Sequence, residues 1–273
     1  MLERLGQIKH VALDLDGTCY KGGTLFDYTN PFLERMTQLG ITRTFLTNNS
    51  SRSRDDYVEH LTAMGITATR DDIFVSTDAT IEFLHTELPD VKRLFILGTP
   101  GIRNEFTDAG FTLTSDSPED EPDAVIAGYD TTLAYEPMCR LAYWVSKGKP
   151  FFATNPDRVC PTDQPNVLVD CGSVCKAIEH ATGRGPDAVL GKPDPRMLSG
   201  IMRRFDLQAH QLAMVGDRLY TDIRMARDAG ALAVLVLTGE ATRSDAETSE
   251  FKPDLIVDDL GQLGELIAAE MSK

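Results

Sequence analysis

The sequence predicts an α/β protein whose core is a parallel sheet with helices on both faces. Two observations predict this fold class. Short apolar strand patterns alternate with amphipathic helix patterns almost throughout the chain, and such alternation is typical of parallel strands joined by right-handed crossovers. Glycines also follow several helix patterns, at the position where helices commonly end.

Elements of the core sheet are predicted in both end regions of the chain. Pro31 is expected in the first turn of a helix that Gly40 terminates, and Gly65 and Gly230 terminate two further helices. The expected strands cover residues 10–13, 42–46, 211–215, 232–237 and 255–257. The expected helices cover residues 31–39, about 52–64, 219–228 and 260–271.

The middle of the chain has a strand and helix pattern of its own. Strands are expected at 93–97, 124–127 and 151–153, helices at 102–109, 135–147 and 173–182, and a loop at 155–166. A block of about one hundred residues has the size of a separate domain. We therefore expect a core domain at 1–79 and 187–273, interrupted by an inserted α/β domain at 80–186. Such an insertion is expected over the carboxyl ends of the core strands, where open α/β sheets bind ligands.

Two acidic segments without large apolar side chains, 115–122 and 240–250, are expected to be the least ordered. The net charge of −15 over 273 residues argues against non-specific nucleic-acid binding, which needs a basic face. No apolar run has the length of a membrane span, and the start lacks the features of a secretory signal. A cytoplasmic protein is expected. An anionic substrate would need a bound cation and a nearby Lys or Arg.

Five cysteines are present, and none forms a Cys-x-x-Cys pair. Cys171 and Cys175 are one helical turn apart, a spacing that can bind a metal. Because no second pair of ligands accompanies them, we expect reduced, small core residues instead.

The first polar motif, Asp14-Leu15-Asp16-Gly17-Thr18, follows a buried strand. If the extended backbone persists to Asp16, the side chains of Asp14 and Asp16 point the same way. One carboxylate can then act as a nucleophile or metal ligand and the other as a proton carrier. Gly17 permits a tight turn whose N–H groups can hold phosphoryl oxygens. The alternative is an ordinary Asp-Gly turn.

Three further motifs follow predicted strands. Thr47-Asn48-Asn49-Ser50 can either cap the next helix or bind a phosphate at its N-terminus. Lys192, between Gly191 and Pro193, is either a surface lysine in a turn or a point charge for a phosphoryl group.

The last motif places Asp217 after a strand and Asp222 five residues later. Asp217 can cap a helix or bind Mg²⁺. For Asp222, an ion pair or a hydrogen bond that orients a metal ligand is favoured over direct metal binding. Because strands of one parallel sheet end at one edge, we expect all four motifs to meet there. Together they predict magnesium-assisted phosphoryl transfer through an aspartyl-phosphate.

The chain resembles the haloacid dehalogenase (HAD) superfamily of phosphatases, in its NagD and p-nitrophenyl-phosphatase branch. All four motifs match, over nearly the whole length. The branch is indicated by segments of the inserted domain: Gly128-Tyr129-Asp130 with Tyr135, Ala153-Thr154-Asn155-Pro156-Asp157, and Cys171-Gly172-Ser173 continuing to Thr182-Gly183-Arg184. The resemblance implies a Rossmann-like HAD core with an inserted α/β cap between the second and third motifs.

The resemblance also implies roles for the motif residues. Asp14 would attack phosphorus, and Asp16 would protonate the leaving oxygen and later activate water. Mg²⁺ would be held by Asp14, the Asp16 backbone carbonyl and Asp217, with Asp222 supporting. The phosphoryl oxygens would be held by Gly17, Thr47, the backbone of Asn48 and Asn49, and Lys192.

The sequence departs from the family pattern at two positions. Tyr220 stands where relatives often have a polar or acidic residue, which leaves Asp217 and Asp222 intact. Cys160 falls where some relatives place a histidine that contacts the substrate, so which leaving group this protein recognises stays an open question. Asn155, Asp157, Arg158 and Cys160 are candidates for contacting it, and the alternative is a well-capped surface loop.

The function expected from these residues is hydrolysis of small soluble phosphate esters such as sugar phosphates, nucleoside monophosphates or, in vitro, p-nitrophenyl phosphate. No nucleic-acid or membrane partner is expected, and cap surfaces in such proteins can form a homodimer. A dehalogenase is disfavoured because alkyl-halide displacement has no use for the proton that Asp16 offers. A phosphomutase and a non-catalytic phosphoryl-binding regulator of the same fold are the alternatives.

Overall fold

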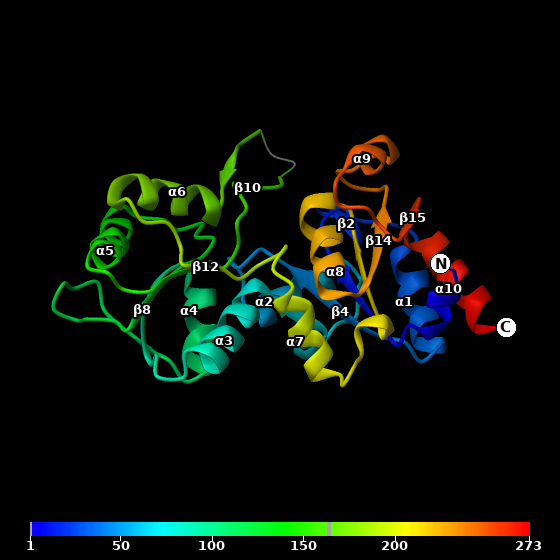
Figure 1. The fold of residues 1–273 in the computed structure, drawn as a ribbon, viewed down its shortest axis with the longest axis horizontal. Coiled ribbons are helices and arrows are strands. Elements are labelled where there is room, and N and C mark those ends of the chain that lie inside the picture. The colour runs from blue at the N-terminus through cyan, green and yellow to red at the C-terminus, as the bar shows by residue number, and fades with distance from the viewer. Residues whose placement is uncertain (1, 163–164) are drawn as a thin grey trace. The chain divides into compact units, whose positions relative to one another are not determined.

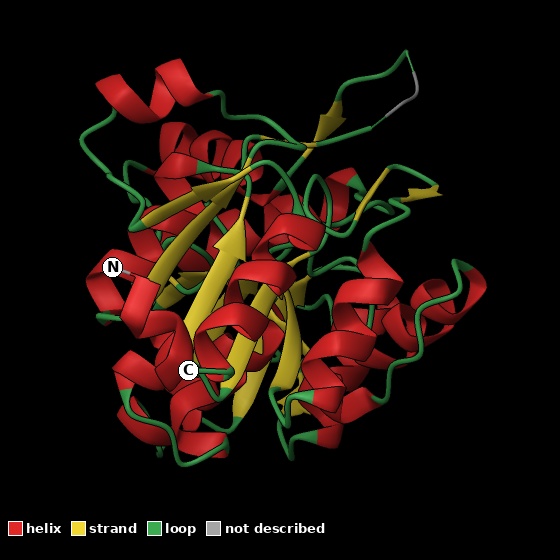
Figure 2. Cartoon of the chain, turned by 90° about the vertical axis from the view of Figure 1, so that its right-hand side faces the viewer, coloured by secondary structure: helices red, strands yellow, loops and turns green. Residues whose placement is uncertain are grey.

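The computed structural model describes residues 2–162 and 165–273, and it has the predicted α/β architecture (Figures 1 and 2). The larger of its two main sheets has six strands in the order β15-β14-β13-β1-β4-β5. The strands are β1 (His10–Asp14), β4 (Thr42–Thr47), β5 (Ile73–Val75), β13 (Leu212–Gly216), β14 (Leu232–Val236) and β15 (Leu255–Val257).

Strand β1 lies at the centre of this sheet, parallel to both of its neighbours. His10 pairs with Leu212 of β13 on one side and with Thr42 of β4 on the other. Every residue of β13 and β14 is buried, as expected for parallel strands that are covered on both faces. The carboxyl ends of β13, β1 and β4 are therefore adjacent, and the polar motifs that follow these three strands are brought to one edge.

Helical segments precede, connect and follow these strands. They are α1 (Thr29–Gln38), α2 (Arg54–Ala63), α7 (Arg196–Arg204), α8 (Arg224–Ala229), α9 (Arg243–Thr248) and α10 (Leu260–Met271), the 3₁₀ turns η1 (Leu2–Gln7), η2 (Arg70–Asp72) and η3 (Ala209–Gln211), and the π-helical turn η4 (Leu219–Ile223). Within the described part of the chain, no helix combines the length and the apolar character needed to cross a membrane.

The second main sheet has five strands in the order β12-β9-β8-β6-β7, and its pairs are parallel. The strands are β6 (Arg93–Leu97), β7 (Thr112–Leu113), β8 (Ala124–Ala127), β9 (Phe151–Ala153) and β12 (Ala188–Val189). The helices of this part are α3 (Ser76–Glu87), α4 (Pro100–Asp108), α5 (Tyr135–Ser146) and α6 (Cys171–Thr182).

Two apolar clusters cover the two faces of the second sheet. One contains Trp144 of α5 and Ile178 of α6, and the other contains Leu84 of α3 and Phe106 of α4. Cys171 and Cys175 are buried in the first cluster as free cysteines, with their sulfur atoms 3.9 Å apart. Two-stranded ribbons complete the fold: β2 (Tyr20–Lys21) with β3 (Thr24–Leu25), and β10 (Val159–Cys160) with β11 (Leu168–Val169).

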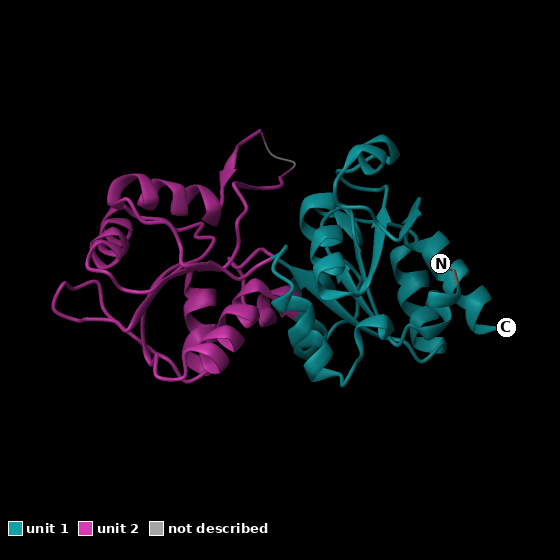
Figure 3. Ribbon diagram, viewed as in Figure 1, with its two compact units in different colours: residues 1–47, 58–73, 192–273 teal, residues 48–57, 74–191 magenta. Residues whose placement is uncertain are grey.

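The chain divides into two compact units, which Figure 3 distinguishes by colour. The first unit contains residues 1–47, 58–73 and 192–273, and the second contains residues 48–57 and 74–191. The motif that follows β4 is thereby divided, because Thr47 belongs to the first unit and Asn48 to the second. The domain borders predicted from the sequence stay a prediction, since compactness does not show which parts fold independently.

Several elements differ from the sequence expectations, among them β10, which lies within the expected loop at 155–166. Strand β5 and helix α3 were not predicted, and α9 lies within 240–250, so the expectation of low order there is wrong. Both helices begin with side-chain caps: Asp78 accepts from Val75 N at 2.8 Å, and Asp245 accepts from Thr242 N at 2.8 Å. Such local hydrogen bonds stabilise a first helical turn without any apolar periodicity in the sequence.

His10 gives the first sheet a pH-dependent stability. Its ring is buried, with Nδ1 2.6 Å from Thr42 Oγ1 and Nε2 3.0 Å from Thr44 Oγ1. Burial, and secondly the charge of Arg204, lower the pKa of His10 from 6.5 to about 4. Below pH 6.5 the unfolded chain therefore binds a proton that the folded protein excludes.

The free energy of unfolding is expected to fall between pH 6.5 and pH 4, by up to about 1.4 kcal/mol per pH unit from this group. Urea unfolding at pH 7 and pH 5 measures it. His10→Gln removes the titration, so the advantage of the wild type over this variant should shrink at pH 5. If the free energy of unfolding changed equally with pH in the two proteins, His10 would not be the titrating group.

Candidate active site

The two acids of the first motif lie at the carboxyl end of β1. Asp14 is the last residue of that strand, and Asp16 lies in the turn that follows, where Gly17 N donates to the Tyr20 carbonyl at 2.7 Å. Gly17 has a φ of +90°, and a β-carbon there would lie 2.5 Å from Asp217 Oδ2. Glycine is therefore required at this position both for the backbone conformation and for the close approach of Asp217.

Lys192 is a buried cation between two carboxylates. Its side chain is 4% exposed, and Nζ donates to Asp14 Oδ1 and, at 2.8 Å, to Asp222 Oδ1. Burial by itself lowers the pKa of Lys192, but the Asp14 and Asp222 carboxylates outweigh it and hold the pKa above its usual value. The ammonium group is therefore charged at neutral pH and fixed in position.

The expectation that all four motifs follow strands of one sheet is wrong for Lys192. The preceding strand, β12, pairs with β9 in the five-stranded sheet, whereas Asp14 ends β1 and Asp217 follows β13 in the six-stranded sheet. A short apolar run before a turn contains no information about which sheet its strand joins. Lys192 nevertheless reaches Asp14, because its side chain is long and its own residue lies in the first unit.

Asp217 directly follows β13, and its two carboxylate oxygens have different surroundings. Oδ2 accepts from Glu240 N at 2.7 Å. Oδ1 is buried and has no hydrogen-bond partner among the described residues. Asp222 lies in η4, is 1% exposed, and accepts from Arg218 N at 3.2 Å through Oδ2.

Glycines allow these acids to pack directly against the backbone. A β-carbon at Gly239 would lie 1.9 Å from Asp217 Oδ2, and one at Gly216 would lie 2.4 Å from Asp222 Cγ. Both distances are far below a normal contact between carbon and oxygen or carbon and carbon. The positions of both carboxylates thus depend on the absence of a side chain at these two residues.

Carboxylate oxygens of Asp14, Asp217 and Asp222 all lie within 4.8 Å of one another. Burial raises the pKa of Asp14 to about 6, with Lys192 opposing the shift. Burial, and then the charges of Asp14 and Asp222, raise the pKa of Asp217 to about 8. The Lys192 ammonium and the nearby Arg218 guanidinium do not balance three such carboxylates. Hard oxygen donors and an unpaired buried oxygen suit a small divalent cation, so the residues fit Mg²⁺.

Comparisons with known proteins agree with this geometry. A family profile described as haloacid dehalogenase-like hydrolase matches residues 11–112, and a HAD-hydrolase-like profile matches residues 189–263. A D-glycerol 3-phosphate phosphatase of Mycobacterium tuberculosis is 34% identical over 253 residues, which are 92% of this chain and 69% of that protein. The chain belongs to the haloacid dehalogenase-like hydrolases.

Solved structures support the same family. The 4-nitrophenylphosphatase of Thermotoga maritima is 38% identical with a TM-score of 0.89, over 96% of this chain and 98% of that one. A protein described as a putative NagD protein is 35% identical with a TM-score of 0.87, over 95% and 98% of the two chains. The predicted resemblance to NagD-like HAD phosphatases is confirmed, and the protein is an enzyme of the phosphatase type.

The second motif of this HAD phosphatase begins where β4 ends. Thr47 is the last residue of β4 and is 8% exposed. Asp14 pairs with Leu46 on this neighbouring strand, so Thr47 is one residue beyond the partner of Asp14. The parallel pairing therefore brings Thr47 beside Asp14 from a position 33 residues further along the chain.

The candidate residues of the inserted region lie around Asn48 and Asn49 within the second unit. Asn48 Nδ2 donates to Asp157 Oδ2 at 3.0 Å, and Asn49 Nδ2 lies 3.7 Å from Cys160 Sγ. Asn155 is fully buried, and Arg158 is exposed. That these four residues contact a leaving group stays a prediction.

Three residues near the acids had no role in the sequence analysis. Thr18 is buried and its Oγ1 donates to Asp14 Oδ2 at 3.5 Å, while Thr238 Oγ1 donates to the Gly17 carbonyl at 2.6 Å. Arg218 pairs with Glu240 at 3.1 Å. Burial lowers the pKa of Arg218, but Asp217 and Asp14 outweigh it and raise it. Each lies within two residues of a strand end or a motif acid, which is the signal that could have identified it.

Proposed function

We propose that this phosphatase hydrolyses monoesters of small soluble phosphates, such as sugar phosphates or nucleoside monophosphates, with Mg²⁺ and through an aspartyl-phosphate on Asp14. The observation that carries the proposal is the cluster of the Asp14, Asp217 and Asp222 carboxylates, two of which, Asp14 and Asp222, bind Lys192. Asp217 Oδ1 has no partner among the described residues. A structure of the glycerol phosphate phosphatase of Mycobacterium tuberculosis, 33% identical with a TM-score of 0.88, is a complex with magnesium, which supports the choice of ion.

In the first half-reaction, a carboxylate oxygen of Asp14 forms a bond to phosphorus and the bond from phosphorus to the ester oxygen breaks. Asp16 donates its proton to the leaving oxygen, which departs as an alcohol. Lys192 holds the Asp14 carboxylate in place through Oδ1 and offers a positive charge to the phosphoryl oxygens. The N–H groups after Gly17 and Thr47, together with the Thr47 hydroxyl, complete the phosphoryl site.

In the second half-reaction, water attacks the same phosphorus. Asp16, now a carboxylate, removes a proton from that water, and the bond from phosphorus to Asp14 breaks to release inorganic phosphate. The cycle returns Asp14 ionised and Asp16 protonated. Asp14, the Asp16 backbone carbonyl and Asp217 would hold Mg²⁺, with Asp222 supporting. When bound, the ion would neutralise these carboxylates and the phosphoryl oxygens.

The proposal is tested by assaying the purified protein against a panel of phosphate esters that includes p-nitrophenyl phosphate, with and without Mg²⁺. We expect release of inorganic phosphate that EDTA abolishes and Mg²⁺ restores. Formation of an isomeric ester without phosphate release would identify a phosphomutase instead. Binding of phosphate esters without any turnover would identify a regulator.

Asp217→Asn is expected to weaken Mg²⁺ binding at least about tenfold and to reduce the rise in melting temperature that Mg²⁺ causes. The amide preserves the shape of the side chain but loses the charge that attracts the cation. Calorimetry with Mg²⁺ alone and the melting temperature with and without Mg²⁺ measure the effect. Asp27→Asn, at an exposed acid of the same unit, is the matched control. A variant that Mg²⁺ stabilises as much as the wild type would contradict the ligand role of Asp217.

Several expectations from the sequence stay predictions. These are the cytoplasmic location, the absence of nucleic-acid and membrane partners, and a homodimer formed through the inserted domain.

A further inference from the structure

Three residues of the second unit form a closed ring of side-chain and backbone hydrogen bonds around the start of the β4–α2 loop. Asn155 Nδ2 donates to the Asn48 carbonyl at 2.9 Å, Asp157 N donates to Asn155 Oδ1 at 3.0 Å, and Asn48 Nδ2 donates to Asp157 Oδ2 at 3.0 Å. Ser76 Oγ also donates to the Asn48 carbonyl at 2.8 Å. We call Asn48, Asn155 and Asp157 the loop ring.

The residues after Asn48 are held by further polar contacts within the same unit. Ser50 Oγ is 2.9 Å from Thr154 Oγ1 and accepts from Tyr129 N at 2.9 Å. Thr99 Oγ1 donates to the Ser51 carbonyl at 2.8 Å. Ser50, Thr154 and Asn155 are all fully buried. Buried polar groups that are satisfied in this way hold a loop in one conformation.

Arg54, in the first turn of α2, extends this attachment. Its backbone N–H donates to Glu105 Oε1 at 2.9 Å, and its guanidinium pairs with Asp78 at 3.3 Å and Glu105 at 3.4 Å. Both acids belong to helices of the second unit, α3 and α4. Residues 48–54 are thus attached to the fold of the inserted region at both of their ends.

Two glycines show how closely the loop ring is packed. A β-carbon at Gly191 would lie 2.5 Å from the Thr154 carbonyl oxygen and 2.6 Å from Asn48 Oδ1. A β-carbon at Gly172 would lie 2.1 Å from the Pro156 carbonyl oxygen. The segment 154–157 therefore has backbone contacts on both sides and little space in which to shift.

We propose that Asn155, with Asp157, is a positioning residue for phosphoryl transfer: it fixes the Asn48–Asn49 backbone, whose N–H groups hold the phosphoryl oxygens. The inference deepens the proposed function and rests on it. A contact of Asn155 with the leaving group is disfavoured, because its side chain is fully buried and both amide atoms are already hydrogen-bonded within the loop ring. Displacement of a catalytic group by about 1 Å can cost about 10²-fold in rate.

The two roles predict different dependence on the leaving group. A residue that contacts the leaving group affects esters unequally, whereas a residue that positions the phosphoryl site affects all of them equally. We therefore compare kcat/KM of the wild type and Asn155→Ala for p-nitrophenyl phosphate, acetyl phosphate and the best sugar phosphate of the panel. Competitive inhibition by inorganic phosphate is measured in parallel, because this product has no leaving group.

We expect Asn155→Ala to lower kcat/KM between about 10-fold and 100-fold for all three substrates, by factors that agree within about threefold, and to raise the inhibition constant of phosphate. Asp157→Ala should behave similarly. Asp157→Asn, which keeps an oxygen acceptor for Asn48 Nδ2, should lose less activity than Asp157→Ala.

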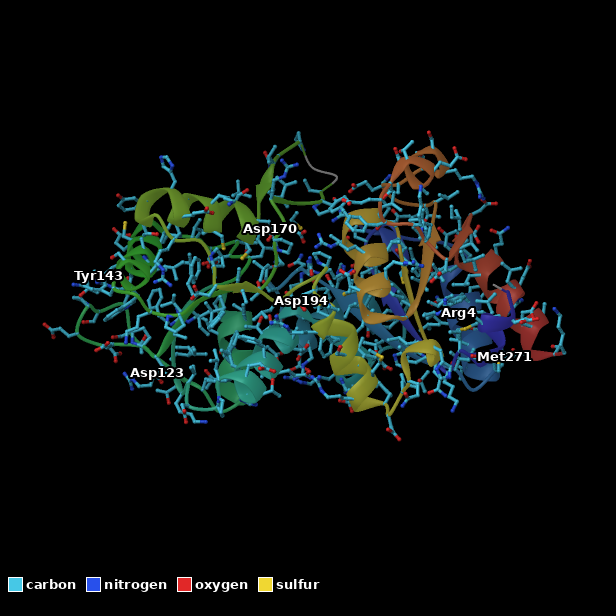
Figure 4. The ribbon with its side chains drawn as sticks, in the orientation of Figure 1. Arg4, Asp123, Tyr143, Asp170, Asp194 and Met271 are labelled. Atoms are coloured by element: carbon cyan, nitrogen blue, oxygen red, sulfur yellow. The ribbon has the colours of Figure 1, made fainter. Side chains whose placement is uncertain are left out.

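Asp123→Ala is the matched control for a merely structural role. Asp123 also fastens backbone N–H groups of the second unit, those of Lys92 at 2.9 Å and Arg93 at 2.8 Å. Asp123 lies at the amino end of β8. Asn155 and Asp157, in the loop that follows β9, lie beside Asp170. Figure 4 shows Asp123 and Asp170 at opposite ends of the unit. Asp123→Ala should reduce stability and leave kcat/KM within about twofold of the wild type.

Each result decides one question. An inactive wild type would overturn the proposed function and this inference with it. An active wild type with Asn155→Ala unchanged, or impaired for one leaving group alone, would overturn the inference and leave the function standing. An equal loss of activity in Asp123→Ala would also overturn it, because general destabilisation would then explain the effect.

Discussion

Asp14→Asn is expected to reduce phosphate release at least about 10⁴-fold while the protein stays folded. An amide oxygen is a much weaker nucleophile than a carboxylate, so the covalent step fails. The substitution preserves the shape of the side chain, and Lys192 keeps its second partner, Asp222, at 2.8 Å. Phosphate release from p-nitrophenyl phosphate and circular dichroism measure activity and folding.

A second measurement isolates the covalent step. Acid quenching during turnover of a ³²P-labelled ester should leave the label on wild-type protein and none on Asp14→Asn. Asp27→Asn, at an exposed acid of the same unit, should behave like the wild type. An Asp14→Asn protein that keeps more than about a hundredth of the activity would remove the nucleophile assignment.

Lys192→Ala is expected to lower kcat/KM about 10³-fold and the free energy of unfolding by about 3 kcal/mol. The side chains of Lys192 and Asp222 are 4% and 1% exposed, so removal of the ammonium leaves carboxylates buried without their counter-charge. Activity on p-nitrophenyl phosphate and urea unfolding in EDTA measure the two effects separately.

Lys176→Ala provides the comparison. Lys176 also pairs with a carboxylate, Glu179, but its side chain is 78% exposed, so its removal should change stability by less than about 1 kcal/mol. If Lys192→Ala were as stable as this control, the three carboxylates would not depend on Lys192 for their charge balance, and the electrostatic account of the site would be wrong.

The fold was predictable where periodic patterns are strong. The strand over β1 and the helix over α10 were expected within a residue of their observed bounds. Helix α3 was not, because its sequence, STDATIEFLHTE, buries threonines and begins at a cap formed by Asp78, so its apolar residues form no clear face. Helix α9 was missed for the same reason, because it lies in an acidic segment and its first turn is stabilised by the Asp245 cap.

The acids of the site were predictable because they follow strands that are adjacent in a parallel sheet. Asp14, the last residue of β1, and Asp217, the residue after β13, meet for this reason. The hydrogen bond from Asn155 to the Asn48 carbonyl was not predictable, because a contact between residues 107 positions apart depends on how the chain folds back. The same holds for Glu240 N, which binds Asp217 from a loop after another strand.

Local chemistry decided which groups this chain brings to phosphoryl transfer: paired acids after a buried strand, a hydroxyl, a lysine between glycine and proline, and a final acid pair. These follow from short-range backbone preferences that neighbouring residues impose. Tertiary structure alone decided that Lys192 reaches Asp14 from beyond a strand of the other sheet, and that the Asn48 backbone is held by the inserted region. Both depend on long-range packing, whose free energy is a sum over many contacts that no single segment of sequence contains.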